Sequence, residues 1–374
     1  MRNKLLNGLT PAQFLHKHWQ KKPLLARGSL PEFADLINRR SLIELALLPE
    51  AEARLITRKG RRWDVRHGPF RRQDFAKLPD RDWTLLVQGV DLLLPRAKEL
   101  LGRFDFIPYA RLDDLMVSYA PPGGGVGPHF DSYDVFLLQG EGTRRWQISR
   151  QRDLTLVENA PLKILSDFRP TREWTLDTGD LLYLPPRYAH DGVALSDCIT
   201  LSVGFRAPSA QDLCSRFYDF LQDNLDARGL YADPHLKATQ QPARIAPQLA
   251  RDLFDLLAQA RWKHADMLRF IGEDLSTPKS HVVFNPPGRA LSAPAFARTA
   301  HRNGLQLAPA SILLYDDHAF YMNGEYCQIP ATARLALCRF ADRRKVPPKT
   351  VLPGSVSETL YTWYRAGFIS LLSD

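Results

Sequence analysis

Apolar and polar residues alternate with a period of two along much of the first half of the chain, which predicts short β-strands separated by polar or glycine-containing turns. The loop 139–142 contains glycine and predicts a hairpin between two of these strands. Many short strands joined by turns are typical of a double-sheet jelly roll of the cupin type. The predicted strands are 53–66, 83–88, 114–120, 133–138, 143–149, 173–176, 181–184 and 199–205.

Helical patterns precede these strands and lie between them. Thr10 followed by Pro11 combines a capping hydroxyl with a proline at the first helical position, and this pair predicts the start of a helix. Further short helices are predicted within 30–48, 73–78 and 93–101.

At Pro208 the apolar spacing changes to a helical period. Ser209 and Asp212 form a capping signature. Apolar residues then share one helical face, at Leu213, Phe217, Phe220, Leu221 and Leu225, and again at Leu249, Leu253, Leu256, Leu257 and Ala260. Periodicity leaves two interpretations open, a helical hairpin that packs on the barrel and a dimerisation surface.

From about residue 276 the pattern mixes helices with a hairpin. Helices are predicted at 293–302, 331–340 and 356–372, with short strands at 312–315 and 319–322. Such a unit resembles a winged helix, but its segment 331–337 is mostly apolar and lacks base-reaching side chains. We therefore expect a structural or partner-binding unit. The chain is α+β, with predicted units at 1–207, 208–275 and 276–374.

Composition narrows the class of protein. The chain has 374 residues, 44% of them hydrophobic, which is enough for more than one domain. Its four cysteines are too few and too scattered for a disulfide framework or a structural zinc cluster. No apolar run approaches the length of a membrane span. We expect a soluble protein in the reducing cytoplasm.

The formal net charge of +9 raises the question of nucleic-acid binding. Much of the excess lies in the segment 54–72, where arginines and lysines face a single acid, Asp64. Such a run gives an electrostatic footprint for phosphates, yet it is usually a solvated face. Direct binding of nucleic acid stays open.

The candidate chemistry centres on the glycine-rich turn 123–131. His129 and Asp131 are two residues apart, so an extended chain directs both side chains to the same side. His190 follows the Gly-Asp turn and apolar run of 179–186 and supplies a third ligand. Two histidines and one carboxylate suit non-haem Fe(II) and leave positions open for a co-substrate and O2. We predict these three residues as the iron ligands.

A co-substrate must supply two electrons, and 2-oxoglutarate does so while chelating the metal. Its far carboxylate needs a cation, and the planar arginine fork binds a carboxylate through two hydrogen bonds. Arg144 lies on the strand after the metal turn and alternates inward with Trp146, so we predict it as this cation. Ser118 and Ser202 either donate to the same carboxylate or are ordinary strand hydroxyls.

Several motifs together resemble the JmjC-type ribosomal oxygenases. They are Gly-Gly-Gly-Val-Gly-Pro-His-Phe-Asp at 123–131, Tyr-Asp-Val-Phe at 133–136, Gly-Thr-Arg-Arg-Trp at 142–146, the segment 183–190, Ser-Val-Gly-Phe-Arg-Ala-Pro at 202–208 and the N-terminal segment 18–25. The resemblance covers the whole chain and implies a JmjC barrel, a helical dimerisation segment and a winged-helix tail.

The resemblance also implies roles for individual residues. The positions that match the family's iron ligands are His129, Asp131 and His190, and those that match its 2-oxoglutarate ligands are Arg144 and Ser118. Eukaryotic relatives carry lysine at the position of Arg144 and hydroxylate histidine. The chain therefore resembles the bacterial branch, which hydroxylates an arginine of large-subunit ribosomal protein sixteen.

A basic protein that acts on a basic ribosomal protein needs local acids in its substrate groove. Tyr133 is a candidate to stack on a guanidinium, with Asp134 beside it as a candidate acid. Asp113, Asp114 and Asp191 also lie near the ligands in sequence. Each of these acids has the alternative of being a loop carboxylate that faces water.

Two other classes of function remain as alternatives. A cupin isomerase or metal-binding storage protein would keep the barrel but would have no need for Arg144 opposite the metal. A metal-dependent sensor or transcription regulator would centre on the winged-helix-like unit. Arg144 and the His-x-Asp pair favour the oxygenase.

Overall fold

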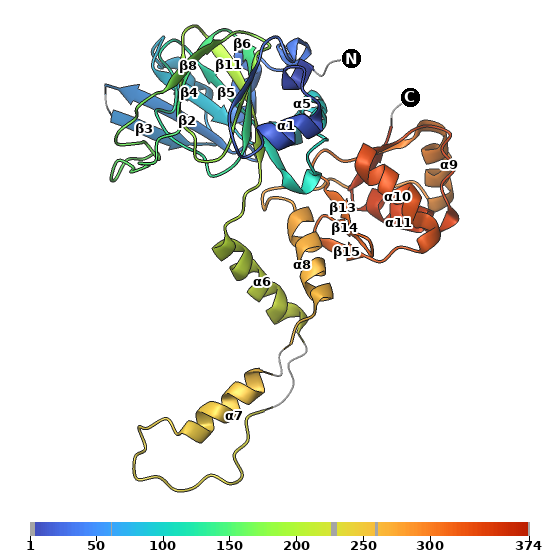
Figure 1. The fold of residues 1–374 in the computed structure, drawn as a ribbon. Coiled ribbons are helices and arrows are strands. Elements are labelled where there is room, and N and C mark those ends of the chain that lie inside the picture. Colours follow the sequence, from blue (N-terminus) through green and yellow to red (C-terminus); the bar gives the residue numbers. More distant parts are fainter. Residues whose placement is uncertain (1–3, 61, 226–229, 259–260, 373–374) are drawn as a thin grey trace.

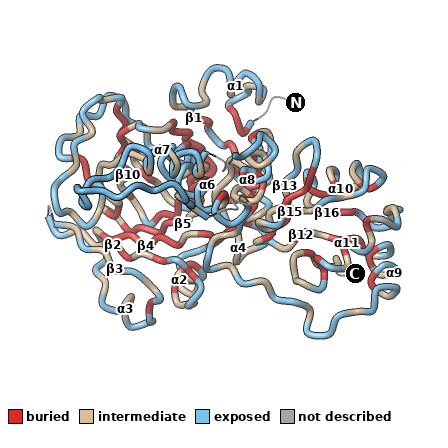
Figure 2. The backbone as a smooth tube through the Cα atoms, turned by 90° about the horizontal axis from the view of Figure 1, so that it is seen from below, coloured by how far each residue is buried: buried red, intermediate tan, exposed pale blue. Residues whose placement is uncertain are grey.

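The structure is a computed structural model that describes residues 4–60, 62–225, 230–258 and 261–372. A two-sheet barrel with its N-terminal helices is followed by helices that extend away from it, and the C-terminal residues form a second compact unit (Figure 1). Buried residues lie along the strands of the barrel and within the C-terminal unit, whereas the extension around α7 is largely exposed (Figure 2).

An eight-stranded sheet, in which every paired neighbour is antiparallel, forms the larger layer of the barrel. In spatial order its strands are β1 (Leu24–Ala26), β9 (Leu181–Leu184), β6 (Val135–Glu141), β11 (Cys198–Phe205), β5 (Leu112–Ala120), β4 (Trp83–Val87), β2 (Ala53–Lys59) and β3 (Arg62–His67). Its main core includes Phe14, Phe104, Phe136, Tyr183 and Phe205. These aromatic residues join the sheet to the N-terminal helices.

A three-stranded antiparallel sheet, β10 (Ala189–Ala194), β7 (Arg144–Ser149) and β8 (Arg172–Leu176), forms the second layer. A smaller cluster of buried residues fills the space between the layers, at Val135, Leu137, Trp146, Ile148, Leu176, Leu182 and Leu184. The two layers confirm the predicted jelly roll. The predicted active-site strands lie on both of them.

The strand prediction was wrong in several places. The range 53–66, predicted as strand, is the two strands β2 and β3, and β1 was not predicted. Gln139 belongs to β6, and β6 and β7 lie in different sheets, so the expected hairpin is a crossing from one sheet to the other. Gly142 makes this crossing with φ 66°, and a Cβ there would lie 1.9 Å from the carbonyl oxygen of Asp197. Strand β10 was missed altogether, because Ala-His-Asp-Gly-Val-Ala has no apolar alternation.

The segment before β5 contributes short helices, several of which pack against the large sheet. They are the 3₁₀ helices η1 (Lys4–Leu6), η2 (Pro31–Phe33) and η3 (Tyr109–Arg111), and the α-helices α1 (Pro11–Lys17), α2 (Arg39–Ala46), α3 (Arg72–Ala76), α4 (Val90–Leu93) and α5 (Pro95–Gly102). The predicted start of α1 is confirmed by a capping box between Thr10 and Gln13. Among the described residues, no helix has the length and apolar character needed to cross a bilayer.

Three helices form the extension, α6 (Ala210–Asn224), α7 (Pro247–Leu257) and α8 (His264–Ser276). The predicted stripe of α6 is closed within the chain, because Phe217 and Leu221 are buried against Phe270 of α8. Apolar side chains are exposed on α7, where Phe254 is 70% exposed and Leu257 73% exposed. Figure 1 shows α7 far from the barrel.

The C-terminal unit has a core of its own, built from three helices and two three-stranded sheets. The elements are α9 (Ala293–Asn303), β12 (Leu305–Leu307), β13 (Leu313–Tyr315), β14 (Phe320–Met322), β15 (Glu325–Cys327), α10 (Ala331–Arg343), β16 (Lys345–Val346), α11 (Gly354–Arg365) and β17 (Ile369–Leu371). The predicted helix 356–372 was too long. Gly367, with φ 79°, turns the chain into β17, which pairs with β12.

Candidate active site

The two ends of the predicted metal motif meet across the barrel. The backbone N–H of His129 donates to the carbonyl of His190 at 2.9 Å, and the N–H of His190 donates to the carbonyl of His129 at 2.7 Å. The N–H of Arg187 donates to the carbonyl of Asp131 at 2.7 Å. As a result, His129, Asp131 and His190 each bring one ligand atom within 4.8 Å of the others.

Hydrogen bonds fix which imidazole nitrogen faces the site. The Nδ1 atom of His129 lies 2.8 Å from the carbonyl oxygen of Gly127, and that of His190 lies 2.8 Å from the carbonyl oxygen of Tyr188. A carbonyl only accepts, so each Nδ1 carries the proton and each Nε2 keeps a free lone pair. Burial, with nearby His129, lowers the pKa of His190 to about 4, which keeps this imidazole neutral.

Glycines bring the metal turn against strand β10. A Cβ on Gly125 would lie 2.5 Å from the carbonyl oxygen of Gly192. On the other side, a Cβ on Gly192 would lie 2.6 Å from the ring of Trp146. The metal turn, β10 and Trp146 therefore pack so closely that only glycine fits at positions 125 and 192. This packing sets the position of His190.

A cavity of about 130 Å³ lies beside the three ligand residues. The predicted Arg144, Ser118, Ser202 and Tyr133 all line it. Four further residues that line it were not predicted as site residues, namely Arg54, Thr84, Met116 and Thr200. These positions follow the inward alternation of β2, β4, β5 and β11, so the strand register carries the missing signal.

Arg144 is buried, with 5% of its surface exposed, and its Nε and Nη2 atoms have no hydrogen-bond partner among the described residues. A buried charge without a counter-charge is costly, so the site calls for an anion. Ser118 and Ser202, which line the same cavity, are buried too. The Nε1 of Trp146 is another buried donor without a partner.

This set of free donors fits 2-oxoglutarate. One end of the cavity offers two imidazole nitrogens and a carboxylate, which suit an octahedral Fe(II) with open positions. Farther along the same face of β7 and β10, Arg144 and Trp146 offer donors for a carboxylate. The side chains of Arg144 and Trp146 are adjacent, with the guanidinium carbon 5.7 Å from the indole ring centre.

The two predicted substrate residues fall in different places. Tyr133 is 40% exposed at the rim of the cavity, where burial and Asp131 raise the pKa of its phenol. Asp134 is fully buried and does not line the cavity. It accepts hydrogen bonds from Tyr183 at 2.6 Å and from Gln20 at 3.0 Å. A substrate contact by Asp134 conflicts with this placement, since these partners already use its carboxylate inside the fold.

The other three acids also differ in position. Asp113 and Asp114 on β5 line the cavity, whereas Asp191 does not. Asp191 follows His190 on β10 and points to the opposite face, as alternation along a strand requires. The cavity thus receives its acids from β5.

Comparisons with known proteins agree with this geometry. The family model of the JmjC domain matches residues 99–213, and that of the ROXA-like winged helix matches residues 255–369. The ribosomal protein uL16 3-hydroxylase of Escherichia coli K12 is 35% identical over 277 residues, which are 73% of each chain. A probable ribosomal oxygenase of Haemophilus influenzae is 43% identical over 210 residues, 55% of this chain and 52% of its own.

Solved structures share the whole fold. The ribosomal oxygenase YcfD of E. coli, in complex with cobalt and 2-oxoglutarate, superposes with a TM-score of 0.82 at 30% identity. The superposition covers 98% of this chain and 99% of that chain. Another E. coli YcfD structure, in complex with cobalt and succinic acid, superposes with a TM-score of 0.80 at the same identity.

The first prediction concerns the metal ligands. His190→Ala should weaken Co(II) binding by more than about 100-fold, because losing a direct ligand costs more than losing a residue that only supports one. Calorimetric titration of the metal-free protein in the absence of O2 measures the affinity. His235→Ala, at an exposed position outside the site, is the control and should bind Co(II) normally. Undiminished Co(II) binding by His190→Ala would contradict the ligand assignment.

The second prediction concerns Arg144. Its replacement by alanine should weaken 2-oxoglutarate binding by about 2–5 kcal/mol, the usual cost of removing one partner of a buried charge pair. Arg144→Lys should lose less, since it keeps the charge but not the planar fork. Arg145→Ala is the matched control, because Arg145 is the next residue on the same strand and its side chain does not line the cavity. Equal affinity in Arg144→Ala and wild type, measured with Mn(II) present and O2 excluded, would rule the role out.

Proposed function

Because the chain belongs to the JmjC-type ribosomal oxygenases, we propose that it hydroxylates an arginine side chain of a large-subunit ribosomal protein. It is a 2-oxoglutarate- and Fe(II)-dependent oxygenase of ribosomal protein. The single observation that carries the chemistry is the unpaired guanidinium of Arg144 in the same cavity as the His-Asp-His set. The uL16 3-hydroxylase supports the choice of substrate, since its name specifies a ribosomal protein.

In such a site, Fe(II) couples the oxidation of 2-oxoglutarate by O2 to hydroxylation, so that 2-oxoglutarate, O2 and a C–H bond become succinate, CO2 and a C–OH bond. The chain supplies the positions. His129, Asp131 and His190 would hold the metal, and the Nδ1–H groups of the two histidines, which donate to backbone carbonyls, keep both imidazoles in the ligating tautomer. Arg144 would anchor the far carboxylate of the co-substrate, and Ser118 lines the same cavity.

The walls of the cavity suit a cationic substrate side chain. Asp113 and Asp114 provide carboxylates on one wall, and Tyr133 provides a half-exposed ring at the rim. A guanidinium can stack on an aromatic ring while it donates to a carboxylate. Burial raises the pKa of Asp114, and Lys279 opposes this effect by its charge. Acids in the groove would attract a basic substrate locally even though the chain has a net charge of +9.

The proposal also includes the organisation of the molecule. It divides the chain into a catalytic unit at 1–207, a dimerisation segment at 208–275 and a winged-helix-like unit at 276–374, and it places the enzyme in the cytoplasm with its ribosomal substrate. The exposed face of α7, with Leu253, Phe254 and Leu257, supports a homodimer, because a second copy would bury this surface by two-fold symmetry.

The third prediction tests the substrate. Incubating the purified full chain with Fe(II), 2-oxoglutarate and large-subunit ribosomal proteins should add one oxygen atom to a single arginine-containing peptide. Mass spectrometry of the digest locates the oxygen, and Arg144→Ala with the same mixture is the control. An oxygen on histidine would overturn the arginine proposal while keeping the oxygenase. No added oxygen on any ribosomal protein would overturn the substrate class.

The fourth prediction tests the dimer. Phe254→Asp should convert a dimer into a 42.5 kDa monomer, because an uncompensated charge buried at an interface costs several kcal/mol. Sedimentation velocity at micromolar concentration measures this change. Leu335→Asp, at a position 64% exposed on α10, is the control and should leave the dimer intact. Phe217→Asp is less informative, since Phe217 already packs against α8. A wild-type chain that sediments as a monomer would refute the proposal.

A further inference from the structure

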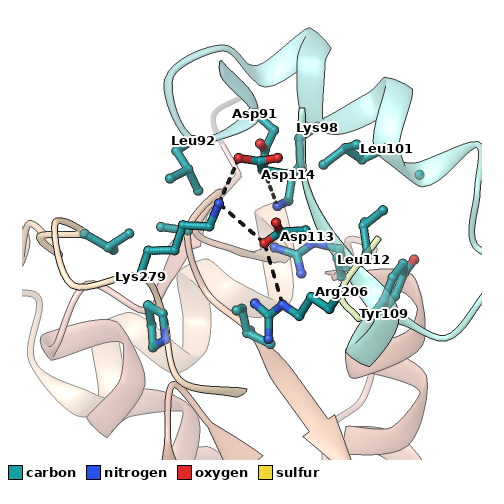
Figure 3. A pocket seen from close by; sticks show the side chains of 16 residues that line it. Asp91, Leu92, Lys98, Leu101, Tyr109, Leu112, Asp113, Asp114, Arg206 and Lys279 are labelled. Carbon is teal, nitrogen blue, oxygen red and sulfur yellow. Dashed lines mark hydrogen bonds and ion pairs between the residues drawn. The ribbon is translucent and has the colours of Figure 1, made fainter. Parts of the chain in front are cut away.

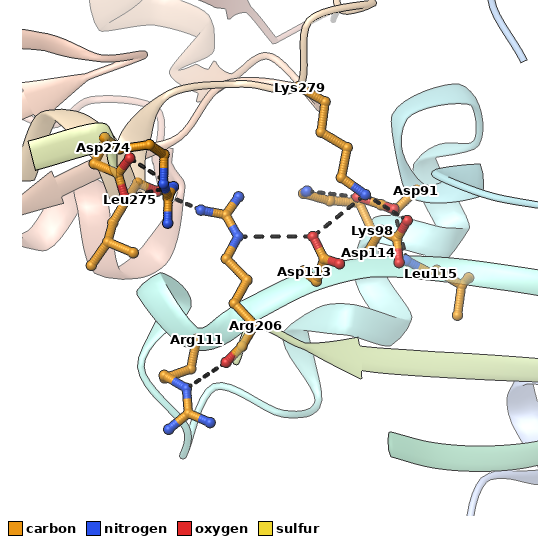
Figure 4. A network of polar contacts seen from close by, with 11 residues as sticks. Asp91, Lys98, Arg111, Asp113, Asp114, Leu115, Arg206, Asp274, Leu275 and Lys279 are labelled. Carbon is orange, nitrogen blue, oxygen red and sulfur yellow. Dashed lines mark hydrogen bonds and ion pairs between the residues drawn. The ribbon is translucent and has the colours of Figure 1, made fainter. Parts of the chain in front are cut away.

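A network of ion pairs joins the barrel to the segment that links α8 to the C-terminal unit. Lys279 of this segment extends toward β5, where its Nζ lies 2.8 Å from Oδ2 of Asp114 and 3.4 Å from Oδ1 of Asp113 (Figure 3). From the end of β11, Arg206 reaches Asp113 at 3.8 Å and donates to the carbonyl of Leu275 at 2.8 Å (Figure 4). The link between the two units is therefore anchored on the acids of one strand.

The same two acids belong to the catalytic cavity. Asp113 and Asp114 line the cavity beside the metal ligands on one side and a second pocket, containing Lys279 and Arg344, on the other. A single pair of carboxylates therefore separates the C-terminal unit from the place where the substrate side chain would lie.

The two oxygens of Asp114 have different surroundings. Oδ2 accepts a hydrogen bond from the ammonium group of Lys279. Oδ1 faces Gly204, lying 3.8 Å from where a Cβ on that glycine would be, and Gly204 itself lines the catalytic cavity. A carboxylate can accept from several donors, so Oδ1 is left for a second cation on the cavity side.

Lys279 favours the charged form of Asp114. It is 5% exposed, and burial raises the pKa of its carboxyl, which favours the neutral form. Among the described residues, Lys279 is the only cation within 4.0 Å of Asp114. Lys98 cannot substitute for it, because its ammonium pairs at 3.0 Å with Asp91, which also accepts from the backbone N–H of Leu115.

We propose that Lys279 is a positioning residue for the hydroxylation. It holds Asp114 ionised and turned so that Oδ1 faces the cavity, where this oxygen receives the cationic side chain of the substrate. The inference rests on the proposed function. It assigns the segment after α8 a part in recognising the substrate, although Lys279 itself belongs to the neighbouring pocket.

The test compares three variants of the full chain. Lys279→Met removes the charge but keeps most of the side-chain length, and it should raise KM for an arginine-containing substrate peptide at least tenfold. Lys279→Arg should restore KM to within about threefold of wild type, since a guanidinium also pairs with a carboxylate. KM for 2-oxoglutarate and its slow turnover without peptide should not change, because Lys279 pairs with neither Arg144 nor the metal ligands and does not line their cavity.

Tyr109→Phe is the matched control. Tyr109 lines the same pocket as Lys279, and its hydroxyl donates to the carbonyl of Asp342 at 3.1 Å, so the variant removes a contact between the units without touching Asp114. Its KM for the peptide should equal that of wild type. A rise in KM in both Tyr109→Phe and Lys279→Met would mean that only the docking of the units matters, and would overturn the positioning role.

The pH profile separates a charge effect from a packing effect. Substrate binding needs the Asp114 carboxylate, so kcat/KM for the peptide falls as pH drops through its pKa. Removing Lys279 removes an effect that lowers this pKa, so the acid limb should move to higher pH in Lys279→Met and return in Lys279→Arg. The groups that surround Asp114 and stay unchanged are Asp91, Lys98, Asp113, Tyr133, Arg54 and Arg206.

Different results would contradict the role of Lys279 and the proposed function. Wild-type KM and an unmoved acid limb in Lys279→Met would overturn the inference while the oxygenase stands. A wild-type chain that oxidises no ribosomal protein would overturn the function itself. If Lys279→Met does not fold, as judged by thermal unfolding, Lys279→Gln replaces it, because the amide still donates to Asp114 but carries no charge. A Lys279→Gln with the wild-type KM and pH profile would equally overturn the role.

Discussion

An unpaired guanidinium inside a two-sheet barrel is the constraint on which the site depends. Transferring a charge from water into a protein interior costs several kcal/mol unless a counter-charge accompanies it. Arg144 has no such partner within the described chain, and the Nε1 of Trp146 beside it is also an unpaired buried donor. The unpaired guanidinium therefore destabilises the fold when the cavity is empty, and a bound dicarboxylate offsets this cost. Binding of the co-substrate supplies the counter-charge that the barrel interior lacks.

The remaining parts of the site follow from how the barrel is closed. Arg144, Trp146 and Ile148 share one face of β7, and His190 and Gly192 stand opposite Ile148 and Trp146 on β10. One antiparallel pair of strands thus sets the distance between the metal ligand and the carboxylate anchor. Glycines at 125 and 192 let the metal turn and Trp146 press against β10, so small residues fix the geometry as firmly as the polar ones.

Sequence was sufficient where the signal is local and insufficient where it depends on pairing. His129 and Asp131 needed only the alternation of an extended chain, and the α6 cap needed only Ser209 and Asp212. Strand β10 could not be predicted, because it has no apolar alternation of its own and is held in place by its pairing with β7. Asp134 is the converse case. Its neighbours in sequence belong to the site, but its carboxylate turns to Gln20 and Tyr183, partners that only the folded chain brings near.

The helical segment shows the same limit and leads to the role of the C-terminal unit. Periodicity identified the stripe on α6 but not its partner, which is α8. Because α8 returns the chain to the barrel, the residues after it reach β5, and Lys279 meets Asp113 and Asp114 there. In the winged-helix-like unit, the segment 331–337 is mostly apolar, which favours a structural or partner-binding role. Through Lys279, this unit contacts the acids that line the cavity. The proposed role of Lys279 would therefore link the C-terminal unit to the charge of the substrate-binding wall.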